Sequence, residues 1–257
     1  MILSGGGKPG SLVRMEGIVK RFGAVEALKG VDLDLRQGEV LGLVGDNAAG
    51  KSTLMKVLTG VHRPDAGRIF FAGFAVEFRN PHESRALGIE MIYQDLALVP
   101  SLDVVANVFL GREKTRPALG GLVRRLDERG MEAATWDVIR RLKINMDSVR
   151  KRVSLFSGGQ QQAVAIGRAM SFNARVIVMD EPTANLAVRE VGKVLDLVRE
   201  LRERGVSVIL ISHRLQDVFA VADRVMVLYG GRAAGVRRVA ETTMDEVVRQ
   251  IVGADGG

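Results

Sequence analysis

One stretch, "GLVGDNAAGKSTLMKVLTG" from Gly42 to Gly60, restricts the possible fold more than any other part of the sequence. It contains the pattern G-x-x-x-x-G-K-[ST] as "GDNAAGKS", after an apolar run and before a helix-like segment. In such a strand, loop and helix, backbone N–H groups surround a phosphate, the lysine reaches the outer phosphates and the hydroxyl holds Mg²⁺. A glycine-rich turn with a surface lysine is the alternative, but the two flanking elements favour phosphate binding. The residues predicted to bind phosphates are Gly45, Asp46, Asn47, Ala48, Ala49, Gly50, Lys51, Ser52 and Thr53.

The pattern of apolar residues predicts a mixed α/β fold. Val40 to Gly45, Arg175 to Asp180 and Ser207 to Ser212 are typical of buried strands, and loops and helical patterns follow them. This alternation favours a largely parallel sheet with helices on both faces. Before it, Leu12 to Glu39 alternates as an antiparallel β layer would, and from about Leu96 to Ser154 the sequence is helical and basic.

With 257 residues, of which 47% are hydrophobic, the chain is long enough for one packed domain with an inserted lobe. We expect a flexible N-terminus at 1–11 and a single domain at 12–252, with a core at 12–95 and 155–235, a helical lobe at about 96–154 and a C-terminal segment at 236–252.

Composition excludes several kinds of site. The sequence has no cysteine and three histidines, so any metal is expected to be bound by oxygen. No apolar run reaches the roughly 18 residues that cross a bilayer, and "MILSGGGKPGS" is too short in hydrophobic length for a signal peptide, so we expect a cytoplasmic location. The net charge of +7 suits a nucleotide, nucleic acid or an anionic membrane surface without choosing among them.

A second motif, "VIVMDEPTAN" from Val176 to Asn185, places Asp180 and Glu181 at the carboxyl end of a buried strand. Ligands of open α/β sheets bind there. We predict that Asp180 supports Mg²⁺ and that Glu181 orients an attacking water. Alone, such a pair is more often the solvated start of a helix, but the phosphate loop favours the chemical roles.

A third motif, "LFSGGQQQAVAIGRAM", joins Ser157, two glycines and Gln160 to an apolar-periodic helix. The serine and the free N–H groups could bind an anion, or the motif could be only a capped helix. With the other two motifs, the sequence resembles the ATPase subunits of ABC transporters, whose signature sequence looks like "SGGQ".

The resemblance implies further roles along the chain. Gln94 in "YQD" resembles the glutamine that contacts Mg²⁺ and reports to the membrane subunits. His213 in "LISHRL" resembles the histidine that touches the γ-phosphate, although a lone histidine after a strand is more often structural. Phe22 in "KRFG" lies where the family stacks a ring on adenine. The implied catalytic residues are Lys51, Glu181 and His213, the metal ligands are Ser52, Gln94 and Asp180, and the further nucleotide contacts are Phe22, Gln94, Ser157, Gly158, Gly159 and Gln160.

The same resemblance implies an α/β fold: a P-loop NTPase core with a mostly parallel sheet, an N-terminal antiparallel β layer and an inserted helical lobe. It implies ATP and Mg²⁺ as cofactors and a homodimer in which a second ATPase copy pairs head to tail. Each ATP would lie between Lys51, Ser52 and Asp180 of one copy and Ser157 and Gly159 of the other. The other implied partners are membrane permease subunits and, indirectly, a periplasmic sugar-binding protein, which place the chain peripherally on the cytoplasmic face of the inner membrane.

Longer stretches, such as "YQDLALVPSLDVVANVFLGRE", are similar to the corresponding sequences in the ATPases of bacterial importers of ribose, xylose or fructose. Many of these carry two fused ATPase halves, and we expect one half here, as in the fructose-type members. The expected function is ATP hydrolysis that energises sugar import, with the sugar itself recognised by the permease and the binding protein.

An alternative is a soluble ABC-type ATPase that acts on nucleic acid or ribosomes through the basic groups Arg124-Arg125, Arg140-Arg141 and Arg150-Lys151-Arg152. Such proteins usually carry tandem ATPase halves or a long coiled coil, and neither appears in this sequence. We therefore expect no nucleic acid partner and assign these groups to a solvated helical face or to the membrane-proximal side. A regulator that binds nucleotide without hydrolysing it is disfavoured by Glu181 and His213.

Two positions depart from the family pattern. Ala48 stands where glycine is usual, and if its φ is positive we expect about fivefold weaker nucleotide binding than with glycine. Residues 184–187 read Ala-Asn-Leu-Ala rather than Ala-Ala-Leu-Gly or Ser-Ala-Leu-Asp. They therefore depart from the family in the loop to which the resemblance assigns communication across the dimer.

Overall fold

The computed structural model describes residues 10–118, 120 and 122–253, and most of the predicted N-terminal segment lies outside this range. Its first sheet is antiparallel, with strand order β2-β1-β4-β5, which confirms the predicted N-terminal β layer. The strands are β1 (Ser11–Phe22), β2 (Val25–Arg36), β4 (Ala66–Phe71) and β5 (Phe74–Val76).

The second sheet contains the three predicted buried strands. Its order is β12-β11-β3-β10-β9-β6, and its pairs are parallel except that of β11 with β12. The strands are β3 (Val40–Gly45), β6 (Ile89–Ile92), β9 (Val176–Asp180), β10 (Ser207–Ile211), β11 (Arg224–Tyr229) and β12 (Arg232–Arg238). Both faces of β3, β9 and β10 are buried, as expected for a parallel sheet that is covered on both sides.

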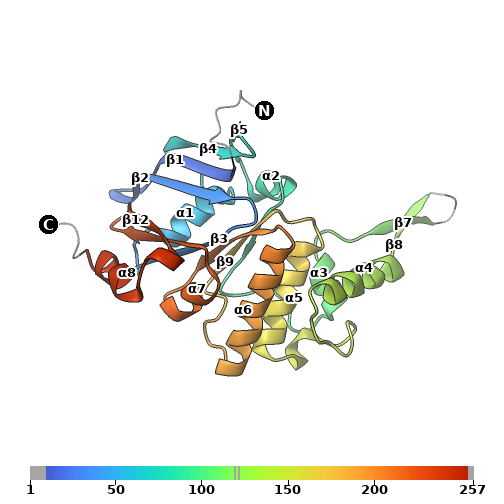
Figure 1. Ribbon diagram of the computed structural model, residues 1–257. Helices are drawn as coiled ribbons and strands as arrows, with labels where there is room; N and C mark the ends of the chain where they lie inside the picture. The colour runs from blue at the N-terminus through green and yellow to red at the C-terminus, as the bar shows by residue number, and fades with distance from the viewer. Residues whose placement is uncertain (1–9, 119, 121, 254–257) are drawn as a thin grey trace.

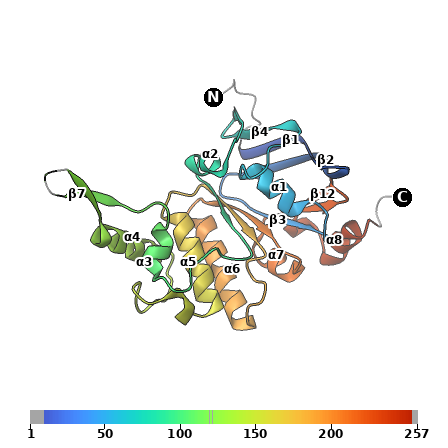
Figure 2. The same cartoon turned by 180° about the vertical axis from the view of Figure 1, so that it is seen from behind.

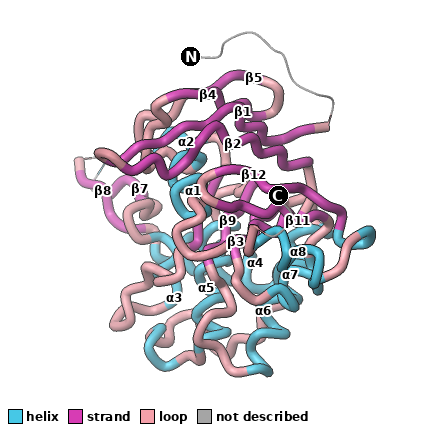
Figure 3. Tube along the Cα trace, turned by 90° about the vertical axis from the view of Figure 1, so that its left-hand side faces the viewer, coloured by secondary structure: helices cyan, strands magenta, loops and turns pink. Residues whose placement is uncertain are grey.

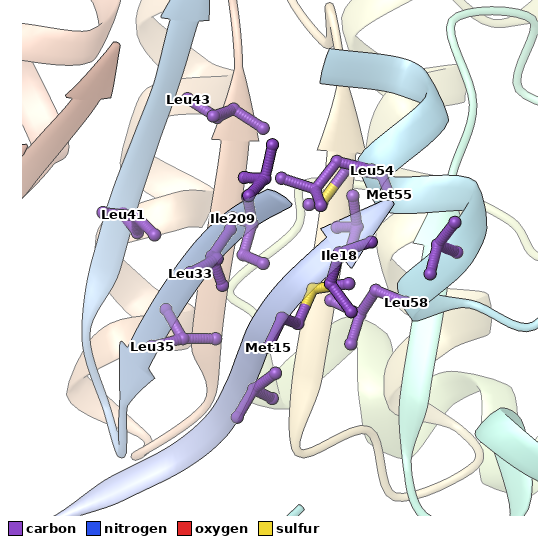
Figure 4. Close-up of a cluster of buried hydrophobic side chains, with 14 of the residues drawn as sticks. Met15, Ile18, Leu33, Leu35, Leu41, Leu43, Leu54, Met55, Leu58 and Ile209 are labelled. Atoms are coloured by element: carbon purple, nitrogen blue, oxygen red, sulfur yellow. The ribbon is translucent and has the colours of Figure 1, made fainter. Parts of the chain in front are cut away.

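Helix α1 (Lys51–Leu58) lies between the two sheets. Leu41 and Leu43 of β3 point toward α1, as Figure 4 shows, together with side chains of the first sheet. Val40 and Val44, on the opposite face of the same strand, pack with the helices below the second sheet. The phosphate loop is therefore carried by an element that is enclosed on both sides.

Helices cover the other face of the second sheet (Figures 1 and 3). They are α5 (Gly158–Met170), α6 (Val188–Glu203) and α7 (Leu215–Val221), with α8 (Met244–Ile251) near the C-terminus. The short helix α2 (Pro81–Ala86) precedes β6 and lies on the side of the first sheet (Figure 1). No helix among the described residues is long and apolar enough to cross a membrane.

The predicted helical lobe has its own small core. Helices α3 (Val104–Phe109) and α4 (Glu128–Arg141) bury apolar side chains against each other and against α5. Between them, β7 (Thr115–Ala118) and β8 (Val123–Leu126) form an antiparallel hairpin that the sequence did not predict. These strands are short, and their described side chains are exposed, so they lack the alternation that marks a half-buried strand. Figures 1 and 2 show the hairpin extending away from the rest of the molecule.

Candidate functional site

A cleft of about 980 Å³ lies at the carboxyl ends of β3, β9 and β10. Parallel strands bring their carboxyl ends to one edge of a sheet, so motifs that are distant in sequence meet there. The cleft is lined by all nine residues predicted for the phosphate loop, Gly45, Asp46, Asn47, Ala48, Ala49, Gly50, Lys51, Ser52 and Thr53, and by Gln94, Asp180, Glu181 and His213.

Neighbouring backbone carbonyl groups lie so close to the two outer glycines of the loop that a side chain would not fit at either position. A Cβ on Gly45 would lie 2.2 Å from the Leu228 carbonyl oxygen, and one on Gly50 would lie 2.8 Å from that of Ala27. Gly50 also has a φ of 103° and precedes α1 without capping it through a side chain. The first N–H groups of α1 are therefore left for an anion in the cleft.

Ala48 adopts a φ of 64°. This is the left-handed region, in which a Cβ is unfavourable and glycine is preferred. The positive φ on which the predicted loss of nucleotide affinity depends is therefore present at Ala48.

The Lys51 ammonium lies across the loop. Its Nζ donates hydrogen bonds to the carbonyl oxygens of Gly45 and Asp46 at 2.8 and 2.9 Å. Burial lowers the pKa of Lys51, and the nearby carboxylates of Glu181, Asp180 and Asp46 oppose this shift. The loop thereby fixes a cation at the position where charge on a phosphate would be neutralised.

Ser52 and Asp180 form an oxygen pair beside this cation. The Ser52 hydroxyl donates to Asp180 Oδ2 at 3.3 Å, and burial raises the pKa of Asp180. Gln94 lines the same cleft. Hydroxyl, carboxylate and amide oxygens suit Mg²⁺. Within the described part of the chain, no cluster of three or more His, Cys, Asp or Glu side chains could hold a metal ion.

Glu181 and His213 are directly paired. His213 Nδ1 lies 2.8 Å from Glu181 Oε2, and the His213 backbone N–H donates to the same oxygen at 3.4 Å. Glu181 has a φ of 52° and is fixed by its backbone N–H, which donates to the Ile211 carbonyl at 3.0 Å. Strained backbone of this kind gathers at functional sites. The two predicted catalytic side chains therefore form one unit at the edge of the cleft.

A buried hydrogen bond that the sequence did not indicate connects the loops that carry these residues. Thr183 Oγ1 donates to Asp217 Oδ2 at 2.6 Å, and both side chains are buried. Thr183 follows Glu181 and Asp217 lies in α7 after His213, so the bond holds the two loops together. Only the folded chain brings them close.

The signature motif lies outside this cleft. Ser157, Gly158, Gly159 and Gln160 lie at the start of α5, where Ser157 and Gln160 form a reciprocal capping box. The Glu190 carboxylate accepts hydrogen bonds from the Ser157 hydroxyl and the Gly159 N–H, which lower its pKa. A Cβ on Gly159 would lie 3.1 Å from Glu190 Cβ, so the contact is close. Sequence reasoning missed Glu190, since nothing in its local pattern indicates the contact.

Phe22 lies at the end of β1 and is 45% exposed. Its ring packs edge-on against His62, with centroids 5.1 Å apart, and lies outside the cleft lining. Val25, its cross-strand partner, does line the cleft. The structure thus places Phe22 beside the cleft rather than in it.

A smaller cavity of about 140 Å³ separates the core from the lobe, close to Gln94. Arg112 Nη1 donates to Glu90 Oε1 at 2.8 Å, which joins the lobe to β6. Arg168 of α5 donates to the carbonyl oxygens of Leu96 and Ala97 at 2.9 and 2.8 Å. Polar contacts therefore join the two parts just after Gln94.

Comparisons with known proteins agree with this geometry. The sequence profile of the family described as ABC transporter matches residues 28–184. The chain is 43% identical over 236 residues to the xylose/arabinose import ATP-binding protein XylG of Sulfolobus acidocaldarius, and the match covers 92% of each chain. It is 42% identical over 245 residues to the fructose import ATP-binding protein FrcA of Rhizobium meliloti, which covers 95% of this chain and 94% of that protein.

The chain spans 48% of the length of the ribose import ATP-binding protein RbsA of Chromobacterium violaceum, to which it is 44% identical. Among solved structures, the ADP conformation of an ATP-binding cassette of an ABC transporter matches with a TM-score of 0.80 and 30% identity. That match covers 95% of this chain and 96% of the other.

Proposed function

The chain belongs to the ABC transporter family, and from this membership we propose that it is the ATPase subunit that energises import of a monosaccharide through a membrane permease. The observation that carries the proposal is one cleft that joins a phosphate loop, the Ser52–Asp180 oxygen pair and the Glu181–His213 pair. Two relatives are named as xylose/arabinose and fructose import ATP-binding proteins, and these names support a sugar as the cargo.

In this proposal, ATP binds with its phosphates against the N–H groups of the loop from Gly45 to Thr53. Lys51, already oriented across the loop, neutralises charge on the outer phosphates. Ser52, Gln94 and Asp180 would hold Mg²⁺, which supplies further positive charge to those phosphates. The raised pKa of Asp180 fits this role, because a buried carboxylate without a cation is costly.

Hydrolysis then needs one oriented water molecule. The water oxygen attacks the γ-phosphorus, the bond to the bridging oxygen breaks, and ADP leaves with that electron pair. Glu181 accepts a hydrogen bond from the water and orients it, and His213 holds Glu181 in place while it approaches the γ-phosphate. Both side chains come from strand ends that the parallel sheet fixes.

The signature motif completes the site from a second copy. Ser157 and Gly159 lie outside the cleft of their own chain, so they serve an ATP only if another chain presents them. A head-to-tail homodimer gives each nucleotide a cleft from one copy and the start of α5 from the other. Opening and closing of this dimer would move the permease between its two access states.

The permease contact is assigned to the lobe of about residues 96–154, with Gln94 as its hinge. The cavity between core and lobe lies beside this hinge, and Leu110 at its edge is 48% exposed. Peripheral binding on the cytoplasmic face of the membrane follows, and a periplasmic sugar-binding protein would act through the permease.

The decisive experiment is reconstitution with the two-subunit permease in vesicles, with ribose, xylose, arabinose and fructose as cargoes. We expect MgATP-dependent uptake of one of them, and loss of uptake with Glu181→Gln. ATPase activity that nucleic acid stimulates and the permease does not would contradict the proposal and favour the soluble alternative.

Crosslinking tests the docking surface separately, since the native chain has no cysteine. Leu110→Cys should crosslink to the permease, whereas Val252→Cys, which is 64% exposed in the C-terminal segment, is the control and should not. The reverse result would show that the docking surface is wrong.

A further inference from the structure

The β7–β8 hairpin has features that ATP hydrolysis does not require. Its strands pack chiefly against each other, and the described side chains of residues 115–117 and 122–126 are exposed. The hairpin projects from the lobe in opposite views (Figures 1 and 2). It therefore presents a surface and contributes little to the core.

The charge of the hairpin has one sign. Residues 114–126 read "KTRPALGGLVRRL", which contains four basic residues and no acidic one. The acids that flank it, Glu113 and Asp127, accept hydrogen bonds from the backbone N–H groups of Gly111 and Gly130. They are thus already engaged by the backbone.

Two of these cations face each other. Arg116 and Arg125 are cross-strand partners, and like charges directly opposite one another destabilise a strand pair. Neither guanidinium has an ion pair with an acid in the described part of the chain, whereas Arg124 is held by a hydrogen bond to Thr115. An external anion would relieve the repulsion between Arg116 and Arg125.

The hairpin also exposes apolar side chains. Leu122, which follows the turn, is 90% exposed, Val123 is 49% exposed, and Leu126 at the base of the hairpin is 46% exposed. Amphipathic helices that lie at a lipid surface combine the same residue types, arginine or lysine with exposed leucine. Pro117 and the arginines disfavour addition of another protein strand to the edge. Residues 113–127 contain no aromatic side chain on which a nucleic acid base could stack.

From these observations we propose that the β7–β8 hairpin binds the anionic lipid surface of the membrane, with Arg116 and Arg125 on headgroup phosphates and Leu122 in the interfacial layer. The hairpin starts next to Arg112, which lines the cavity assigned to the permease contact. The inference rests on the proposed function for the presence of that membrane, and it gives the ATPase a lipid contact that is independent of the permease.

The test is flotation of the full nucleotide-free chain with vesicles, without permease. We expect binding to phosphatidylglycerol–phosphatidylcholine vesicles and little binding to pure phosphatidylcholine. Arg116→Gln with Arg125→Gln should weaken partitioning about twenty-five-fold, because each basic residue near an anionic surface contributes about a factor of five. Leu122→Ser should weaken it further.

The matched control is Arg79→Gln with Arg237→Gln, which removes the same charge from exposed positions outside the hairpin and the lobe. An equal loss of binding in the control would overturn the inference, because net charge would explain it. So would stronger binding to single-stranded RNA than to anionic vesicles. All variants should keep MgATP binding and ATPase activity, so failure of vesicle binding with intact hydrolysis would refute the lipid contact alone.

Discussion

Replacing Ala48 by glycine tests how the phosphate loop stores strain. Alanine in the left-handed region costs about 1–2 kcal/mol, and glycine loses about 0.4–1 kcal/mol more entropy on folding. The difference is about 1 kcal/mol in favour of glycine. Ala48 has a φ of 64°. We expect the loop to keep this conformation with and without nucleotide, so that the cost falls on folding and not on binding.

We therefore expect Ala48→Gly to raise Tm by about 2–4 °C, as 1 kcal/mol does in a domain of this size. The change in ATP affinity should stay within about twofold, smaller than the fivefold effect that the sequence alone suggested. The measurements are thermal unfolding of the ligand-free protein and titration calorimetry with MgATP.

Ala49→Gly is the control, because Ala49 is buried and its φ is not positive. It should lower Tm, since glycine there costs about 0.5–1 kcal/mol without relieving strain. An unchanged Tm for Ala48→Gly, together with fivefold tighter ATP binding, would refute the reasoning and show that the loop becomes strained only when nucleotide binds.

The other predictions concern carboxylates. Glu181→Gln should keep ATP binding but lower turnover at least about a hundredfold, because the water loses its orienting carboxylate; phosphate release that stays near the parent rate would exclude this role. Asp180→Asn should raise the Tm of the nucleotide-free protein at neutral pH, because burial raises the pKa of Asp180 and its ionised form therefore destabilises the fold. Acid should remove the difference as the pH falls through that raised pKa toward 3.8, and a Tm difference that persists in acid would point to another cause. Glu190→Gln in the Glu181→Gln background should strengthen ATP-driven dimerisation, measured by size-exclusion chromatography. The reason is that the Glu190 carboxylate occupies the Ser157 and Gly159 hydrogen-bond donors, which we propose bind the γ-phosphate of the ATP held by the other copy. Weaker dimerisation would mean that Glu190 instead orients Ser157 for binding.

The features that the sequence predicted well are local. The phosphate loop, the buried strand that ends at Asp180 and the start of α5 at Gly158 are each specified by consecutive residues. A parallel sheet then places strand ends together by its topology, which is why Lys51, Asp180 and His213 could be expected in one cleft.

The features that the sequence did not predict depend on contacts between distant residues or on short elements. Glu190 meets Ser157 only because α5 and α6 pack side by side. The hairpin strands are four residues each, too short for a periodic signal, and lack a buried face. Phe22 was assigned by family position, and the packing of its ring on His62 was not visible in the sequence.

Helix α1, enclosed between two sheets, has a mechanical consequence. Leu54, Met55 and Leu58 are fully buried, so a shift of α1 would disturb packing on both sides. Nucleotide binding is therefore expected to leave this helix stationary as a fixed reference point. Displacement would then fall on the lobe, which has a separate core and is joined to β6 by the contact between Arg112 and Glu90. A stationary phosphate site and a lobe that rotates about Gln94 would turn a change of bound nucleotide into movement of the lobe surface that we propose contacts the permease.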